Sequence, residues 1–181
     1  MQRIYLVRHG QTNDNAHKIV SGSRETALSH LGISQAHHAG QHAKGLGIDL
    51  IVASPLERAQ QTAKIIAQEI GYPPEAIVTI NNLAERNLGD LEGTSYAHNE
   101  KLNGNFPAVD HIMGVEKLVS FHNRVQDALR GLLRDSSHHT ILIVCHIGVG
   151  RMLRTVAEGK SSHHMYNQPR LENATIYPLI A

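Results

Sequence analysis

The sequence is poor in several features that define whole classes of protein. Its single cysteine, Cys145, excludes an intramolecular disulfide and argues against a secreted, disulfide-linked scaffold. Tryptophan is absent and aromatic residues make up only 4% of the chain, which argues against nucleic-acid binding by base stacking. The longest apolar run, Ile141 to Cys145, is far too short to cross a bilayer.

The chain also lacks a large excess of positive or negative charge. The net charge is +1 with histidine neutral, and no basic block stands out. The sequence therefore gives no electrostatic reason to expect nucleic acid or a membrane surface as a partner. The N-terminus runs straight into an apolar segment without the pattern of a signal peptide, so we expect a soluble cytoplasmic protein. The sequence alone specifies no oligomeric state.

What the chain does contain is an alternation of strand-like and helix-like segments. Its 181 residues, 41% of them hydrophobic, suffice for one domain with a buried core, and we expect residues 1–181 to form a single domain. Apolar runs of strand length occur at 4–7, 50–53, 141–145 and, more weakly, 77–80. This order predicts an α/β fold with a mostly parallel central sheet between two helical layers. A last candidate strand, 175–179, contains Pro178 and is predicted to lie at a sheet edge.

Capping residues and apolar spacing predict three helices. Ser54-Pro55-Leu56-Glu57 is typical of a capping box, with Ser54 as the N-cap. Ser29 is predicted to cap a helix that runs to about Lys44, and another helix is predicted from about Glu116 to Arg134. Residues 86–114 are polar, glycine-rich and without a sustained period, so we expect a loop-rich cover over one end of the sheet.

Two arginines and two histidines are predicted to meet at one edge of the sheet. Arg8 and His9 end the first strand, His146 follows another strand, and Arg58 lies in the first turn of the helix after a third. The carboxyl ends of parallel strands share one edge, where α/β proteins bind ligands. A phosphate group, with about −1.5 to −2 charges, is the expected occupant of this positive field. Gly10 would let the backbone approach it closely.

The combination of these residues resembles the histidine phosphatase superfamily, which includes the cofactor-dependent phosphoglycerate mutases. The similarity extends over nearly the whole chain and implies a phosphoglycerate mutase-like fold. It rests on the segments 8–12, 22–32, 54–63, 85–93, 114–116 and 172–174. One difference concerns the last catalytic strand, which the family usually follows with His-Gly. Here the order is His146-Ile147-Gly148, and we expect Ile147 to reshape the leaving-group side of the pocket.

The resemblance implies a nucleophile and a phosphate cradle. His9 would attack phosphorus through one neutral ring nitrogen and form a phosphohistidine, while a backbone carbonyl held its other nitrogen. Arg8, Arg58 and His146 would hold the phosphoryl oxygens. Asn15 and the backbone near Ser21 and Gly22 would complete this cradle.

The resemblance also implies a proton donor. Glu85 would protonate the leaving oxygen and then take a proton from water, with Glu92 as the second choice for this acid. A salt bridge from Glu85 to Arg86 or to another arginine is the structural alternative for the same carboxylate. No metal ion or other cofactor is expected, because the two arginines supply the charge that a metal otherwise would.

Three functions fit this set of residues. We expect a phosphomonoester hydrolase for a small phosphorylated metabolite, because the chain has Arg86-Asn87-Leu88-Gly89 where the mutases have a segment like Arg-His-Tyr-Gly. Mutase-type phosphoryl transfer is the alternative. A non-catalytic phosphate-binding module is disfavoured, since nucleophile, arginines and acid are all present. The cover residues expected to touch the organic part of the substrate are Tyr96, His98, Asn99 and Lys101.

Two competing sites are weaker. Cys145 beside His146 suggests a thiol nucleophile, but its place at the end of an apolar strand favours a buried structural cysteine. Adjacent histidines suggest metal binding, yet neighbours on a helix do not share a face and no acidic partner stands at ligand spacing. We expect these pairs to be surface residues: His37-His38, His138-His139 and His163-His164.

Overall fold

The computed structural model describes residues 2–97, 109–135 and 137–180. Its centre is a five-stranded sheet with the strand order β3-β2-β4-β1-β5. The first four strands along the chain are parallel to one another, and the last lies antiparallel to β1 at the edge. The strands are β1 (Arg3–Arg8), β2 (Leu50–Ala53), β3 (Val78–Thr79), β4 (Thr140–Cys145) and β5 (Ile176–Ile180). The predicted α/β fold and the edge position of the Pro178 strand are both confirmed.

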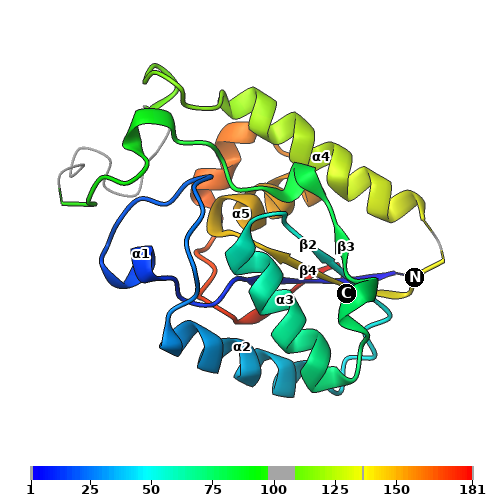
Figure 1. The fold of residues 1–181 in the computed structure, drawn as a ribbon. Helices are drawn as coiled ribbons and strands as arrows, with labels where there is room; N and C mark the ends of the chain where they lie inside the picture. The colour runs from blue at the N-terminus through cyan, green and yellow to red at the C-terminus, as the bar shows by residue number, and fades with distance from the viewer. Residues whose placement is uncertain (1, 98–108, 136, 181) are drawn as a thin grey trace.

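Helices cover both faces of the sheet, which gives three layers (Figure 1). On one face lie α2 (His30–Ala43) and α3 (Glu57–Ile70), and on the other lie α4 (Leu118–Arg134) and α5 (Ile147–Ala157). Alternate side chains of the strands enter the two cores. In β4, for example, Ile143 packs with the α4 and α5 side while Val144 packs with the α2 and α3 side. The strands are therefore apolar on both faces, as their sequence predicts.

Shorter elements connect these layers. They are α1 (Asn13–Ala16) and the 3₁₀ turns η1 (Pro74–Ala76), η2 (Asn81–Leu83), η3 (Gly89–Leu91) and η6 (Ser162–Asn167). The predicted loop-rich cover at 86–114 contains η3 and turns in its described part. Its candidates His98, Asn99 and Lys101 lie outside the described residues. Among the helices that are described, none combines the length and apolar character needed to span a bilayer.

The predicted helix starts meet different outcomes. Ser29 is the N-cap of α2, and its Oγ accepts a hydrogen bond from the amide of Gly32 at 3.1 Å, as predicted. The predicted capping box of α3 is wrong: the helix begins at Glu57, and its N-cap Leu56 has no side-chain capping bond. Instead, the Oγ of Ser54 lies 2.7 Å from Nε2 of His146. The same Oγ accepts a hydrogen bond from the amide of Leu56 at 3.3 Å, so the hydroxyl of Ser54 fixes the turn before α3 but does not cap the helix itself.

The third predicted helix, α4, also begins later than expected, at Leu118 rather than Glu116. Glu116 stays outside the helix because its carboxylate accepts hydrogen bonds from Arg124 and from the amide of Asn87.

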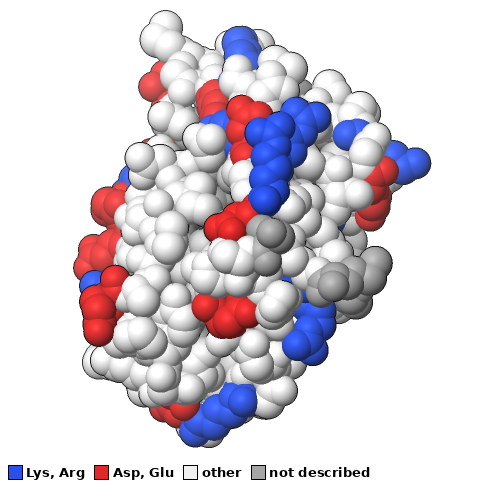
Figure 2. All heavy atoms as spheres, turned by 90° about the vertical axis from the view of Figure 1, so that its right-hand side faces the viewer, with Lys and Arg blue, Asp and Glu red and all other residues white. Residues whose placement is uncertain are grey.

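Charged side chains of both signs are interspersed among uncharged ones on the face shown in Figure 2. That face carries no block of one sign.

Candidate active site

The pairing of β1 with β4 brings the two candidate histidines together. Arg8 pairs with Cys145 in register, so the next residues of the two strands, His9 and His146, lie side by side. Their ring centroids are 5.2 Å apart with an angle of 59° between the planes. Beyond this edge lies a cavity of about 360 Å³. His146 is fully buried beside His9, and the other seven residues predicted for the site line the cavity: Arg8, His9, Asn15, Ser21, Gly22, Arg58 and Glu85.

The ring of His9 is held in one orientation. Its Nδ1 lies 2.7 Å from the carbonyl oxygen of Gly10, which can only accept, so Nδ1 carries the proton and Nε2 keeps its lone pair. Burial, followed by the charges of Arg58 and Arg8, lowers the pKa of His9 well below its usual value. The imidazole is therefore neutral at physiological pH, which is the form that a nucleophile requires.

The two cradle arginines are anchored by backbone carbonyls. Arg8 donates to the carbonyl of Leu171 at 3.1 Å, while Arg58 donates to Gly22 at 2.7 Å and to Arg24 at 2.8 Å. Burial lowers the pKa of both guanidinium groups. Each still has a buried Nε that has no hydrogen-bond partner among the described residues, and the same is true of the buried Oγ of Ser21. A buried donor without an acceptor costs free energy in the folded protein, but the same donor can form a hydrogen bond with a bound anion.

His146 is the N-cap of α5 and is held by Ser54 through its Nε2. Its Nδ1 is buried and finds no hydrogen-bond partner in the part of the chain that the structure describes. Burial, Arg58 and His9, in that order, lower the pKa of His146 well below its usual value. Both histidines are thus kept neutral by the same positive, desolvated surroundings.

Glu85 reaches the site from the segment after η2. Its Oε2 accepts a hydrogen bond from the amide of Gly148 at 2.9 Å, and its Oε1 accepts one from the amide of Arg86 at 2.9 Å. The guanidinium of Arg86 instead pairs with Asp110 and donates to Tyr166 and Glu116. The alternative of a Glu85–Arg86 salt bridge is therefore not what the described residues form.

Gly148, two residues after His146, lies directly against the side chain of Glu85. A Cβ at this position would lie 2.4 Å from Oε1 of Glu85, so the carboxylate would have to shift. The glycine therefore allows the carboxylate to pack directly on the first turn of α5. Ile147, the residue that precedes it, lines the cavity.

Glu92, the second choice for the acid, has a different place. Its Oε1 accepts hydrogen bonds from the amide and hydroxyl of Ser23, at 2.7 and 2.9 Å, and from the amide of Leu88 at 2.9 Å. It ties two loops together and is not among the side chains that line the cavity. Glu85 is the acidic side chain that does so among the described residues.

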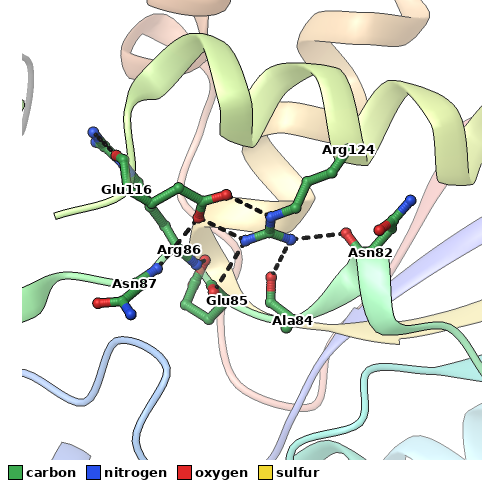
Figure 3. A network of polar contacts seen from close by, with 7 residues as sticks. All are labelled: Asn82, Ala84, Glu85, Arg86, Asn87, Glu116 and Arg124. Atoms are coloured by element: carbon green, nitrogen blue, oxygen red, sulfur yellow. Dashed lines mark hydrogen bonds and ion pairs between the residues drawn. The ribbon is translucent and has the colours of Figure 1, made fainter. Parts of the chain in front are cut away.

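Arg124 of α4 fixes the segment that carries Glu85 (Figure 3). It donates to the carbonyls of Asn82, Ala84 and Glu85 at 2.8, 2.7 and 3.1 Å. Its other contacts are to both carboxylate oxygens of Glu116, at 2.7 and 2.9 Å. A rigid planar group thus holds three backbone acceptors within four residues in place behind the carboxylate.

Further arginines in the cavity were not identified from the sequence. Arg151 and Arg170 both line it. Arg151 lies one helical turn after Ile147 in α5. The helical spacing of the residues that follow His146 would therefore have been a usable signal that Arg151 lines the cavity. Arg170 lies in the segment between η6 and β5, and nothing in its local sequence indicates that it returns to the site.

The competing sites lie elsewhere. Cys145 is fully buried in β4, and burial raises the pKa of its thiol, so it is a structural cysteine as expected. The paired histidines lie outside the cavity, and one member of each pair is near a carboxylate. These contacts are His37–Glu69 at 2.8 Å, His164–Glu158 at 3.3 Å and His138–Asp49 at 3.8 Å.

A three-layer α/β fold with an Arg-His-Gly turn and a second histidine at the same sheet edge defines the phosphoglycerate mutase-like class. The family model of the histidine phosphatase superfamily (branch 1) matches residues 4–180, and the chain belongs to this superfamily.

Individual relatives include mutases and phosphatases. The probable phosphoglycerate mutase GpmB of Yersinia pestis (strain Pestoides F) is 45% identical over 92 residues, which is 51% of this chain and 41% of that protein. The alpha-ribazole phosphatase from Shigella flexneri is 28% identical with a TM-score of 0.83, over 98% of this chain and 89% of that one. A mycobacterial glucosyl-3-phosphoglycerate phosphatase shares the fold, with a TM-score of 0.88 and 24% identity over 98% and 92% of the two chains.

Proposed function

We propose that the protein hydrolyses phosphomonoesters of small metabolites through a phosphohistidine at His9. The observation that carries this proposal is the state of His9 itself. Its ring is buried at the cavity, its Nδ1 proton is held by Gly10 and its pKa is lowered, so a neutral Nε2 lone pair is available. Histidine in this state forms covalent intermediates.

The reaction has two steps. In the first, Nε2 of His9 attacks phosphorus, the bond to the ester oxygen breaks, and Glu85 gives its proton to the departing alcohol. In the second, water attacks the phosphohistidine, Glu85 takes the water proton, and the phosphorus–nitrogen bond breaks to release inorganic phosphate. A positioned acid and base of this kind contributes typically about 10²–10⁴ in rate.

The charge that develops on the phosphoryl oxygens is met by two fixed cations and a neutral imidazole. Arg8 and Arg58 each have a buried Nε at the cavity that no described residue accepts from, and the neutral ring of His146 lies beside that of His9. Asn15, Ser21 and Gly22 complete the cradle on the side of α1. Such preorganised donors stabilise the transition state without a metal ion, so the proposed reaction is metal-independent.

Mutase-type phosphoryl transfer is the second candidate. It is favoured by the 45% identity to the probable phosphoglycerate mutase over half of the chain. In that reaction the phosphohistidine would pass its phosphoryl group to a second hydroxyl of a sugar acid instead of to water. The two functions share the first step and differ in the acceptor.

Hydrolysis of p-nitrophenyl phosphate in the presence of a chelator, across pH 5–8, tests the proposal. We expect turnover by the wild type, none by His9→Ala, and normal turnover by His38→Ala, which removes an exposed histidine of α2. Activity that requires added metal, or that survives in His9→Ala, would refute the mechanism. Isomerisation of phosphoglycerate with a bisphosphate primer separates mutase from hydrolase.

A further inference from the structure

Ser54 and His146 form a buried pair at the carboxyl ends of β2 and β4. The Oγ of Ser54, the residue after β2, lies 2.7 Å from Nε2 of His146, the residue after β4. Both residues are fully buried. Buried polar groups are nearly always hydrogen-bonded, so each of these two groups needs a partner within the protein. The neighbours of the pair therefore decide which of the two groups donates.

The hydroxyl of Ser54 has one hydrogen to donate and can also accept from other donors. It accepts from the amide of Leu56 at 3.3 Å. Within the described ranges, its remaining hydrogen-bond partner is Nε2 of His146. If Nε2 carried a proton, the hydroxyl would accept twice and its own hydrogen would be buried without an acceptor, which costs free energy. Every hydrogen of the pair finds an acceptor when Ser54 donates to an unprotonated Nε2.

The same pairing locates the ring proton of His146. Burial, and after it the charges of Arg58 and His9, lower the pKa of this ring well below its usual value, so the neutral form carries one N–H. Because Nε2 accepts from Ser54, that proton lies on Nδ1. Nδ1 is buried, and no described residue offers it an acceptor. His146 thus keeps an unused donor near the ring of His9, whose centroid is 5.2 Å away.

His9 and His146 are protonated at the same ring nitrogen but are anchored to the fold through opposite ones. The carbonyl of Gly10 accepts from Nδ1 of His9, which leaves a lone pair on Nε2. Ser54 donates to Nε2 of His146, which leaves the proton on Nδ1. One neutral ring is therefore prepared to attack phosphorus, and its neighbour is prepared to donate a hydrogen bond.

We propose that Ser54 is a positioning residue that fixes the tautomer of His146, so that Nδ1 donates to a phosphoryl oxygen during transfer to His9. The inference rests on the proposed phosphatase function and adds the residue that prepares one of its donors. In the opposite tautomer, Nδ1 would present a lone pair to the same negative oxygen and repel it. A donor that is fixed before the reaction stabilises the developing charge without reorganisation in the transition state.

NMR of the protein with 15N-labelled histidine tests the tautomer directly, because protonated and unprotonated ring nitrogens differ strongly in 15N chemical shift. At neutral pH the wild type should show a protonated Nδ1 and an unprotonated Nε2 for His146, whose signals are those missing from His146→Gln. In Ser54→Ala the Nε2 signal should move toward the protonated value, because no hydroxyl then donates to its lone pair. His9, assigned with His9→Gln, should still show a protonated Nδ1.

Kinetics test the consequence for phosphoryl transfer. We expect kcat/KM of Ser54→Ala to fall roughly tenfold, the effect of one hydrogen bond, on p-nitrophenyl phosphate and on an alkyl phosphate alike. Both substrates present the same phosphoryl oxygens to Nδ1, whereas a loss of acid catalysis would depend on the leaving group. Thr155→Val is the matched control. It removes another buried hydroxyl, which donates to the carbonyl of Arg151 at 3.0 Å, and should keep the wild-type rates and tautomer.

The outcomes separate this inference from the proposed function. If the wild type hydrolyses no phosphomonoester, the proposed function fails, and the NMR spectra still show whether Ser54 fixes the tautomer. A protonated Nε2 in His146 of the wild type would overturn the inference. So would Ser54→Ala with the wild-type tautomer, or with wild-type rates on both substrates. A loss confined to the alkyl phosphate would equally contradict it, because the hydroxyl would then act through Glu85.

Discussion

The carboxylate of Glu85 and the amide of Gly148 are joined by a hydrogen bond of 2.9 Å, which links the proposed acid to the first turn of α5. The same helix begins immediately after His146, so the acid and the second histidine are positioned by one rigid element. The relationship makes the residue at position 148, and not only Glu85 itself, important for protonation of the leaving group.

We predict that Gly148→Ala displaces Glu85 and weakens acid catalysis. The added Cβ would lie 2.4 Å from Oε1, so the carboxylate must move. The rate with an alkyl phosphate, whose leaving oxygen needs a proton, should fall by about 10²-fold or more, and that with p-nitrophenyl phosphate by much less. Steady-state kinetics with both substrates measures this difference.

Gly131→Ala is the matched control. Gly131 lies in α4, and a Cβ there meets nothing within 4 Å. This variant should keep the activity on both substrates and gain about 0.5–1 kcal/mol in the free energy of unfolding, because alanine favours the helix. An equal loss on both substrates in Gly148→Ala would contradict the assignment of Glu85 as the acid.

Arg124→Met should also lower the alkyl phosphate rate more than the p-nitrophenyl phosphate rate, because Arg124 positions Glu85 through the backbone. The change removes the donors to the carbonyls of Asn82, Ala84 and Glu85 and leaves Glu116 without its ion pair. We expect the alkyl phosphate rate to fall more than the p-nitrophenyl phosphate rate, together with a loss of about 2 kcal/mol in the free energy of unfolding. Arg124→Lys should restore part of the stability but little of the alkyl phosphate rate, because an ammonium cannot span three acceptors.

Denaturant unfolding should become pH-dependent through His9 and His146. Their pKa values are lowered by burial and nearby cations, so below about pH 6.5 the unfolded chain binds protons that the folded chain does not. Stability therefore rises with pH in this range and is lost as pH falls from about 6.5 toward the folded values, by up to about 1.4 kcal/mol per pH unit for each histidine. His9→Gln and His146→Gln should each reduce the slope by about that amount in phosphate-free buffer. Slopes equal to that of the wild type would contradict the neutral, buried state of the rings.

Cys145 should be inert in the native protein. Its thiol is fully buried and its pKa is raised by that burial, so the thiolate that reacts with iodoacetamide is not formed. We expect no alkylation and no loss of phosphatase activity under native conditions, and complete alkylation in denaturant. Mass spectrometry and a parallel activity assay test this, and inactivation that follows native alkylation would revive the thiol mechanism.

The sequence was sufficient for the sheet and for the position of the proposed nucleophile. The apolar strands of β1, β2 and β4 and the residues that follow them place His9, Arg58 and His146 at one edge by topology alone. Pro178 likewise limits β5 to the edge, because proline lacks the amide of an inner strand.

Features that depend on contacts between distant segments were not predictable in this way. Ser54 has the local pattern of a helix cap, but the buried ring of His146, 92 positions later, is its partner. Arg124 donates to carbonyls about 40 positions earlier, and no local period connects the two segments. Arg151 and Arg170 were likewise identified at the cavity only when α5 and the segment before β5 were placed around it.

Trapping the covalent intermediate tests the mechanism most directly. Glu85→Gln lacks the base for the second step, while p-nitrophenyl phosphate needs no acid for the first. This variant should therefore release one burst of p-nitrophenol per enzyme molecule and accumulate a phosphoryl group. The mechanism predicts that peptide mapping at alkaline pH finds this group on His9. A burst without a label, or a label on any other residue, would contradict it.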